Sequence, residues 1–168
     1  MSSQSPQLFG GAPSLLTGTE PALVAEIPGA GGRWTQVHFN LDVMRRFFHL
    51  EPGKSKSITL ERINSSGEVQ SRTLRQLVFS TENSNAKLEF DFSPVPSYPP
   101  SSTRPLLVVV EASYLTFRFR MVMPGESGYP QLTSLLSAGP PIGRGVKRRL
   151  VTLDEVEAFW PKARLRGE

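Results

Sequence analysis

The stretch "GAGGRWTQVHFNLDVMRRFF", residues 29–48, is the part of the sequence that decides the fold. A glycine-rich approach leads into "WTQVHFN" (34–40), whose alternation of polar and apolar residues predicts a β-strand. Asn40 is typical of a helix N-cap, and the apolar residues after it recur at helical spacing. The stretch therefore predicts a strand followed by a short amphipathic helix. On the polar face of the strand we expect Trp34, Gln36 and His38.

The glycine run itself admits more than one interpretation. Phosphate-binding glycine loops open a helix, whereas Gly29, Gly31 and Gly32 precede a strand, so no helix N-terminus is available to hold a phosphate. Two interpretations stay open. The run is either a flexible turn or a mobile arm that presents Arg33 and Trp34 to a large ligand.

β-Strands dominate the rest of the pattern. The clearest alternation, "YLTFRFRMVM", points its apolar residues to a core and its arginines to solvent. No regular strand–helix–strand alternation is present, so the pattern predicts a mainly β, barrel-like fold with two or three short helices. The predicted strands cover 22–27, 34–40, 57–63, 69–80, 87–92, 106–112 and 114–123, and the predicted helices cover 41–50, 130–139 and 152–161.

The composition sets further limits. The 168 residues contain no cysteine, which excludes disulfides and thiol chemistry, and carry a net charge of +4, which favours a polyanionic partner. No apolar run is long enough to span a membrane, and the N-terminal residues lack the features of a secretory signal, so a cytoplasmic protein without membrane contact is expected. We expect a loose lead-in at 1–21, a domain at 22–138, and a basic linker with a terminal helix at 139–168.

Candidate catalytic groups are few. Asp91 and Glu111 are the carboxylates best placed to hold Mg²⁺ in a nuclease, but neither has the lysine partner that such sites use, and Asp91 lies on the outward face of its strand. His38 and His49 have no Ser or Asp constellation around them. We therefore predict no catalytic residue and no metal site. A nucleic-acid contact by His38 remains as plausible as an ordinary surface histidine.

The polar loop "STENSNAK" (80–87) is the second candidate binding element. Asn, Glu and Lys side chains can hydrogen-bond base edges or phosphates in the major groove. The same composition is also common in solvated hairpin loops, so both interpretations stay open. The candidate contacts in this loop are Thr81, Glu82, Asn83, Asn85 and Lys87.

With these pieces in order, residues 22–123 resemble the B-three-type DNA-binding pseudobarrel of plant transcription factors and restriction endonucleases. The resemblance is carried by residues 29–48 and is closest to the amino-terminal effector domain of EcoRII-type enzymes. It implies a seven-stranded open pseudobarrel whose two arms grip the DNA major groove. By resemblance, the first arm contains Arg33, Trp34, Gln36 and His38, and the second contains Thr81, Glu82, Asn83, Asn85 and Lys87.

The resemblance implies a function. The chain is expected to be a monomeric, sequence-specific binder of double-stranded DNA, with a short site of the CC(A/T)GG type, in the bacterial cytoplasm. It would be the non-catalytic effector domain of a type II restriction endonuclease, without a cofactor of its own, and Mg²⁺ would serve only a nuclease domain that this chain lacks. Two alternatives stay open: a small Mg-dependent nuclease using Asp91 or Glu111, and a β-barrel protein-interaction module.

Overall fold

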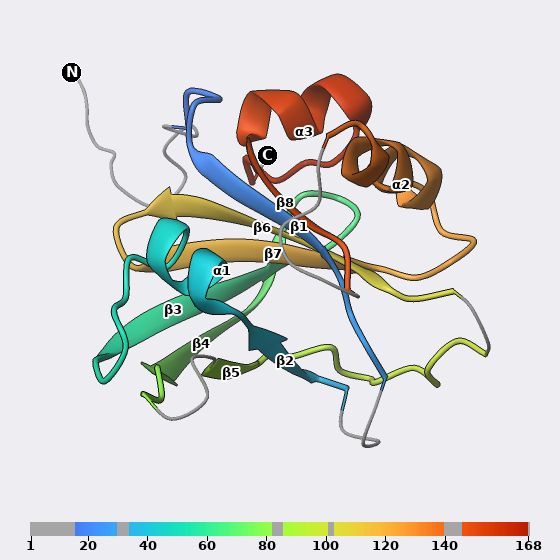
Figure 1. Cartoon of the computed structure of the whole chain (residues 1–168). Helices are drawn as coiled ribbons and strands as arrows, with labels where there is room; N and C mark the ends of the chain where they lie inside the picture. Colours follow the sequence, from blue (N-terminus) through green and yellow to red (C-terminus); the bar gives the residue numbers. More distant parts are fainter. Residues whose placement is uncertain (1–15, 30–33, 82–85, 101–102, 140–145, 168) are drawn as a thin grey trace.

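A computed structural model describes residues 16–29, 34–81, 86–100, 103–139 and 146–167, and these residues form eight strands and three short helices (Figure 1). The predicted mainly β class is confirmed. None of the described helices has the length and apolar character needed to cross a membrane. The strands are β1 (Pro21–Glu26), β2 (Gln36–Phe39), β3 (Ser55–Ile63), β4 (Val69–Val78), β5 (Ala86–Glu89), β6 (Leu106–Ser113), β7 (Thr116–Val122) and β8 (Arg148–Thr152), and the helices are α1 (Leu41–Arg46), α2 (Tyr129–Ser137) and α3 (Leu153–Phe159).

The strands form one large mixed sheet and one small sheet. The large sheet has the order β4-β3-β7-β6-β1-β8, and β3–β7 is its parallel pair. The hairpin predicted over 57–80 is confirmed as the antiparallel pair β3–β4. Strands β2 and β5 pair only with each other, antiparallel, and we call this pair the β2–β5 ribbon. Among the described residues β4 and β8 are not paired, so the large sheet is open and no closed barrel forms.

Two apolar cores lie on opposite faces of the large sheet. Alternation along β1, an inner strand of the sheet, supplies both cores: Leu23 and Ala25 face the first, and Ala22 and Val24 face the second. The first core is rich in aromatic residues and is covered by α1 and the β2–β5 ribbon. The second is covered by α2 and α3. The β2–β5 ribbon and helix α2 therefore lie on opposite sides of the sheet.

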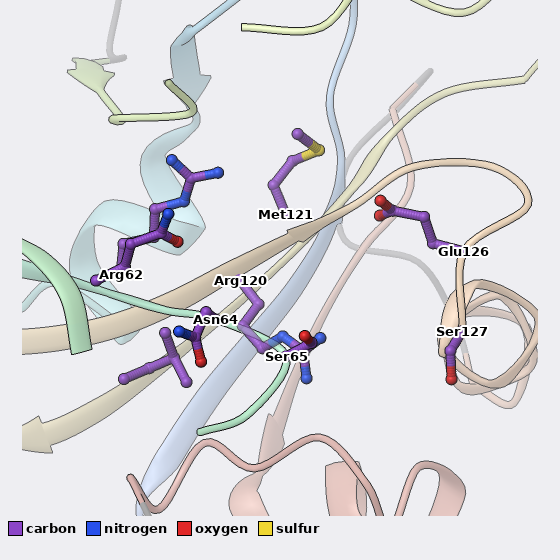
Figure 2. Close-up of a pocket in the computed structure, with 9 residues that line it drawn as sticks. Arg62, Asn64, Ser65, Arg120, Met121, Glu126 and Ser127 are labelled. Carbon is purple, nitrogen blue, oxygen red and sulfur yellow. The ribbon is translucent and has the colours of Figure 1, made fainter. Parts of the chain in front are cut away.

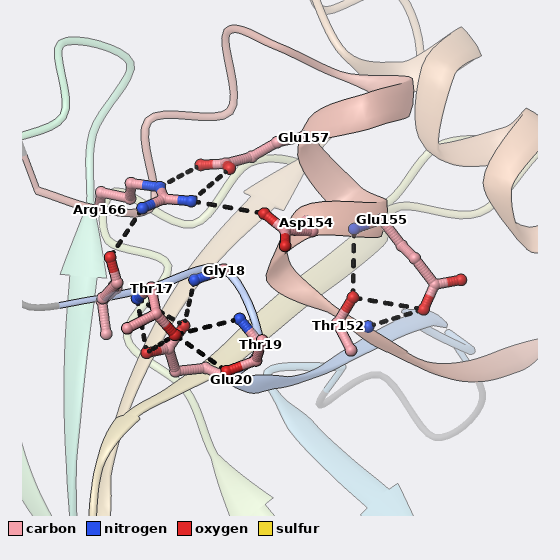
Figure 3. Close-up of polar contacts among 10 residues, drawn as sticks. Thr17, Gly18, Thr19, Glu20, Thr152, Asp154, Glu155, Glu157 and Arg166 are labelled. Atoms are coloured by element: carbon pink, nitrogen blue, oxygen red, sulfur yellow. Dashed lines mark hydrogen bonds and ion pairs between the residues drawn. The ribbon is translucent and has the colours of Figure 1, made fainter.

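The predicted helix signals are largely correct. The Asn40 side chain accepts a hydrogen bond from the Val43 backbone N–H at 3.1 Å, which confirms the N-cap of α1. The helix ends at Arg46, several residues earlier than predicted, yet Phe47 and Phe48 are still fully buried. At α3 the predicted capping box is present, with Thr152 and Glu155 bonding each other's backbone N–H groups (Figure 3).

Two expectations about the second half of the chain are wrong. Residues 139–149 were predicted to be a linker with a basic end; residues 140–145 lie outside the described residues, but at the basic end Arg148 begins β8, an edge strand hydrogen-bonded to β1. Arg118 and Arg120 were predicted to face solvent. Instead they bond backbone carbonyls of residues 163–166, because the C-terminal segment crosses this face of β7.

The C-terminal end of the described chain is also tied to its N-terminal end. Arg166 forms ion pairs with Glu157 at 2.8 Å and with Asp154 at 3.6 Å (Figure 3). The same guanidinium donates to the Leu16 carbonyl at 2.7 Å. The two ends of the described chain are therefore held together on the face of the large sheet that carries the second core.

Candidate nucleic-acid interface

The β2–β5 ribbon has one apolar face and one polar face. Val37, Phe39, Ala86 and Leu88 are buried in the first core. In the register of the ribbon, Gln36 lies opposite Glu89 and His38 opposite Lys87, so these four side chains share the outer face. His38 and Lys87 are exposed, and Gln36 and Glu89 are half-buried. We call Gln36, His38, Lys87 and Glu89 the outer face of the ribbon.

This outer face has side chains that the fold leaves unused. Within the described part of the chain, no hydrogen bond or ion pair engages the side chains of Gln36, His38 or Lys87. Glu89 is different, because its carboxylate accepts a hydrogen bond from the Thr35 hydroxyl at 2.8 Å. The face thus offers amide, imidazole and ammonium groups, all of which can hydrogen-bond a ligand.

The structure places the predicted site residues unevenly. It brings Gln36, His38 and Lys87 together on the ribbon, which sequence separation alone did not reveal. Thr81 is exposed just beyond the end of β4. Four of the predicted contacts, Arg33, Glu82, Asn83 and Asn85, lie outside the described residues.

Trp34 does not share the exposed face of Gln36 and His38, and that prediction is wrong. Its side chain is only 6 % exposed, and its ring stacks on Phe92 at 5.4 Å and meets the edge of Tyr98 at 5.5 Å. The strand begins at Gln36, so the alternation does not extend back to Trp34. The indole therefore anchors the start of the ribbon in the core.

Two arginines contact the ribbon from neighbouring strands. Arg75 of β4 donates to the Glu89 carbonyl at 3.1 Å, and Arg148 of β8 donates to the His38 carbonyl at 3.2 Å. Sequence reasoning missed Arg148 because it placed the basic end of "GPPIGRGVKRR" in a linker. Both guanidinium groups bring positive charge to the ribbon without direct contact with an acidic side chain among the described residues.

A second candidate site is a surface cavity of about 390 Å³ between β3, β7 and the loop before α2 (Figure 2). Its charged groups are already engaged. Arg62 donates to the Ser93 carbonyl at 2.6 Å, Arg120 lies 4.5 Å above the Trp160 ring, and Glu126 accepts from the Met123 N–H at 2.8 Å. These contacts engage the charged groups with residues outside the cavity, so the cavity is a weaker candidate than the ribbon.

The two carboxylates considered for nuclease chemistry have separate structural contacts. Asp91 accepts a hydrogen bond from the Ser93 N–H, and bonds from Ser93 hold its pKa below its usual range. Glu111 lies 3.1 Å from the Nε2 atom of His49. Within the described residues, no group of three or more His, Asp or Glu side chains is gathered closely enough to hold a metal ion.

Comparison with known proteins shows a likeness in fold alone. No protein-family model matches the sequence, and no curated protein sequence matches it. Among solved structures, the chain is similar to the N-terminal domain of Helicobacter pylori LlaJI.R1, with a TM-score of 0.54 and 12% sequence identity. The match covers 78% of this chain and 97% of that domain, so the two share most of their architecture.

Proposed function

We propose that this chain binds double-stranded DNA at a specific short sequence, as the non-catalytic recognition domain of a restriction endonuclease. The observation that carries the proposal is the outer face of the β2–β5 ribbon. Gln36, His38 and Lys87 are held side by side on a buried aromatic scaffold, and their polar groups have no partner among the described residues. Polar groups fixed in this way are available to read base edges.

The dimensions of the ribbon suit the major groove of B-DNA. A groove about 12 Å wide admits a two-stranded β-ribbon. Each strand of the ribbon has four residues, and at about 3.4 Å per residue the reading face is roughly 10 Å long. Trp34 and Ala86, which belong to the two segments proposed as arms, lie at opposite ends of the ribbon.

The fold comparison supports the same proposal. The structural neighbour is the N-terminal domain of LlaJI.R1, and the shared architecture is compatible with a DNA-binding role here. The more specific likeness to the B-three-type pseudobarrel, and to EcoRII-type effector domains within it, remains part of the proposal. Arg33, Glu82, Asn83 and Asn85 also remain proposed contacts.

Fluorescence anisotropy with labelled duplexes tests the proposal directly. The first candidate site is CC(A/T)GG, and selection from random duplexes would identify others. A duplex that contains the recognition site should bind at least ~10³-fold more tightly than a duplex of scrambled sequence. Plasmid DNA incubated with the protein and Mg²⁺ should stay intact. Equal binding to every duplex, or no binding at moderate salt, would overturn the proposal.

Variants of the ribbon locate the site. Gln36→Ala should cost about 1–3 kcal/mol of specific binding if the amide reads a base. Lys87→Ala should weaken specific binding in the same range if the ammonium reads a base. If the ammonium instead contacts a phosphate, Lys87→Ala should weaken binding to all sequences equally. Matched controls are Gln131→Ala and Lys162→Ala, which change exposed residues of α2 and of the C-terminal segment. If the controls weaken binding as much as the ribbon variants, the ribbon is not the reading face.

A further inference from the structure

The predicted linker contributes an arginine to the ribbon, and its environment is unusual. Arg148 pairs with Ala25 in the β1–β8 register, so it lies on the face of the sheet that carries the first core and the ribbon. Its neighbour Arg149 pairs with Val24 and points to the opposite face, where it donates to the Leu135 carbonyl at 2.7 Å. The two adjacent arginines of this edge strand thus lie on opposite faces of the large sheet.

The charge of Arg148 is not neutralised within the described residues. Arg45, Arg104 and Arg166 each contact a carboxylate. Among the described residues, Arg148 makes one hydrogen bond, to the neutral carbonyl of His38, although its side chain is partly buried. Burial lowers the pKa of Arg148, and no acidic group in the described part of the chain offsets this effect.

Holding a partly desolvated cation without a counter-charge is costly, and an anionic ligand would remove that cost. A guanidinium has five N–H donors in a fork that matches phosphate oxygens, and the His38 carbonyl occupies one of them. The bond to the His38 carbonyl also fixes the guanidinium against the backbone of β2, the strand whose Gln36 and His38 belong to the outer face of the ribbon. A phosphate of a duplex seated on that face is the anion that this position fits.

We propose that Arg148, held on β8 against the backbone of β2, contacts a DNA phosphate beside the ribbon and fixes the register of the duplex on the reading face. This inference rests on the proposed DNA-binding function. It assigns β8 a role in the interface, in addition to its structural role at the sheet edge. Phosphate contacts of this kind position a protein without carrying sequence information.

The salt dependence of binding distinguishes a phosphate contact from other roles. Each neutralised phosphate contributes about 0.9 to the slope of log affinity against log salt concentration. Arg148→Gln should lower the magnitude of that slope by about 0.9. The ratio of wild-type to variant affinity should therefore fall about 3.5-fold between roughly 50 and 200 mM salt. It should weaken binding to specific and scrambled duplexes by the same factor. Arg148→Lys, which keeps the charge, should retain the wild-type slope.

Arg149→Gln is the matched control, because it removes the same charge from the same strand on the other face, and its slope should stay at the wild-type value. Far-UV circular dichroism and thermal melting confirm that each variant is folded. If Arg148→Gln does not fold, Arg148→Met, which retains the aliphatic stem, gives the same comparison.

An unchanged slope in the folded, uncharged variant would overturn the inference and leave the proposed function standing. A loss of affinity in Arg148→Gln that is confined to the specific duplex would also overturn the inference, because it would show that Arg148 reads a base. A wild-type protein that binds no duplex would overturn the proposed function itself.

Discussion

Glu61 provides the sharpest test of how the large sheet is held together. Its carboxylate is only 7 % exposed and lies between two arginines, with one oxygen 2.9 Å from Arg118 Nε and the other 2.8 Å from Arg72 Nε. Arg118 also donates to the Arg166 carbonyl at 2.9 Å, so the ion triad connects β3 and β7 to the C-terminal segment. Replacing Glu61 by Gln leaves both guanidinium groups without a counter-charge.

The expected cost follows from the burial of the two arginines. The Arg118 side chain is 22% exposed, and a hydrogen bond to a charged group in such a place contributes about 1.5–3 kcal/mol. The Arg72 side chain is 61% exposed, and its pair should contribute about 0–1 kcal/mol. Glu61→Gln should therefore destabilise the protein by about 1.5–4 kcal/mol, or roughly 3–16 °C in melting temperature, whereas Arg72→Gln should cost less than about 1 kcal/mol.

The pH dependence gives an independent check. Burial raises the pKa of Glu61, but hydrogen bonds and charge from Arg118 and Arg72 outweigh burial and hold the pKa below its ordinary value of 4.5. A carboxyl with a lowered pKa in the folded state stabilises the protein above its unfolded value and loses that contribution as pH falls. The stability difference between wild type and Glu61→Gln should be complete above pH 4.5 and shrink below it. Urea unfolding at several pH values measures this difference. A variant within about 0.5 kcal/mol of wild type at neutral pH would refute the reasoning.

Further predictions concern the two cores and are checked by urea or thermal unfolding. Phe48→Ala should cost about 3–5 kcal/mol, because the buried ring packs 4.9 Å from the Phe117 ring; a loss below ~1 kcal/mol would show that this core repacks freely. Gly128→Ala should destabilise the protein by more than ~1 kcal/mol, because φ is +97° and an added Cβ would overlap the Trp160 ring; a neutral effect would contradict this geometry. Thr152→Ala should cost about 0.5–2 kcal/mol through loss of the α3 capping box, and an unchanged melting curve would count against it.

The sequence predicted local structure well where the pattern was long and regular. The hairpin over 57–80 is confirmed. Within 114–123, residues 116–122 form β7 with Phe117 and Phe119 in the first core as predicted, because binary patterning at the strand period selects the core face, although the C-terminal segment covers the other face. The capping residues Asn40 and Thr152 were also identified correctly, since caps are local chemistry. These signals depend on neighbouring residues, and no long-range contact is needed to interpret them.

Long-range pairing could not be predicted in the same way. Nothing in the sequence indicates that Gln36 pairs with Glu89, yet this register creates the outer face of the ribbon. The strand beginning at Arg148 was missed because its charged residues follow a run of Pro and Gly, which is typical of a linker. Edge strands tolerate charge, however, and charged side chains there oppose unwanted pairing. Trp34 was assigned to the wrong face because the alternation was extended beyond the true start of β2.

The β2–β5 ribbon is too small to be stable by itself, because two paired strands of four residues are at best marginal in water. Its position must come from packing. Phe39 lies 5.3 Å from Phe48 and 6.3 Å from Phe90, and Trp34 anchors the chain at the other end of β2. A slip of one residue in this register would turn Phe39 and its apolar neighbours to water and bury the polar face. The aromatic core therefore fixes which side chains the ribbon presents, so stability and recognition depend on the same residues. Weakening that core should loosen the reading face before it unfolds the sheet.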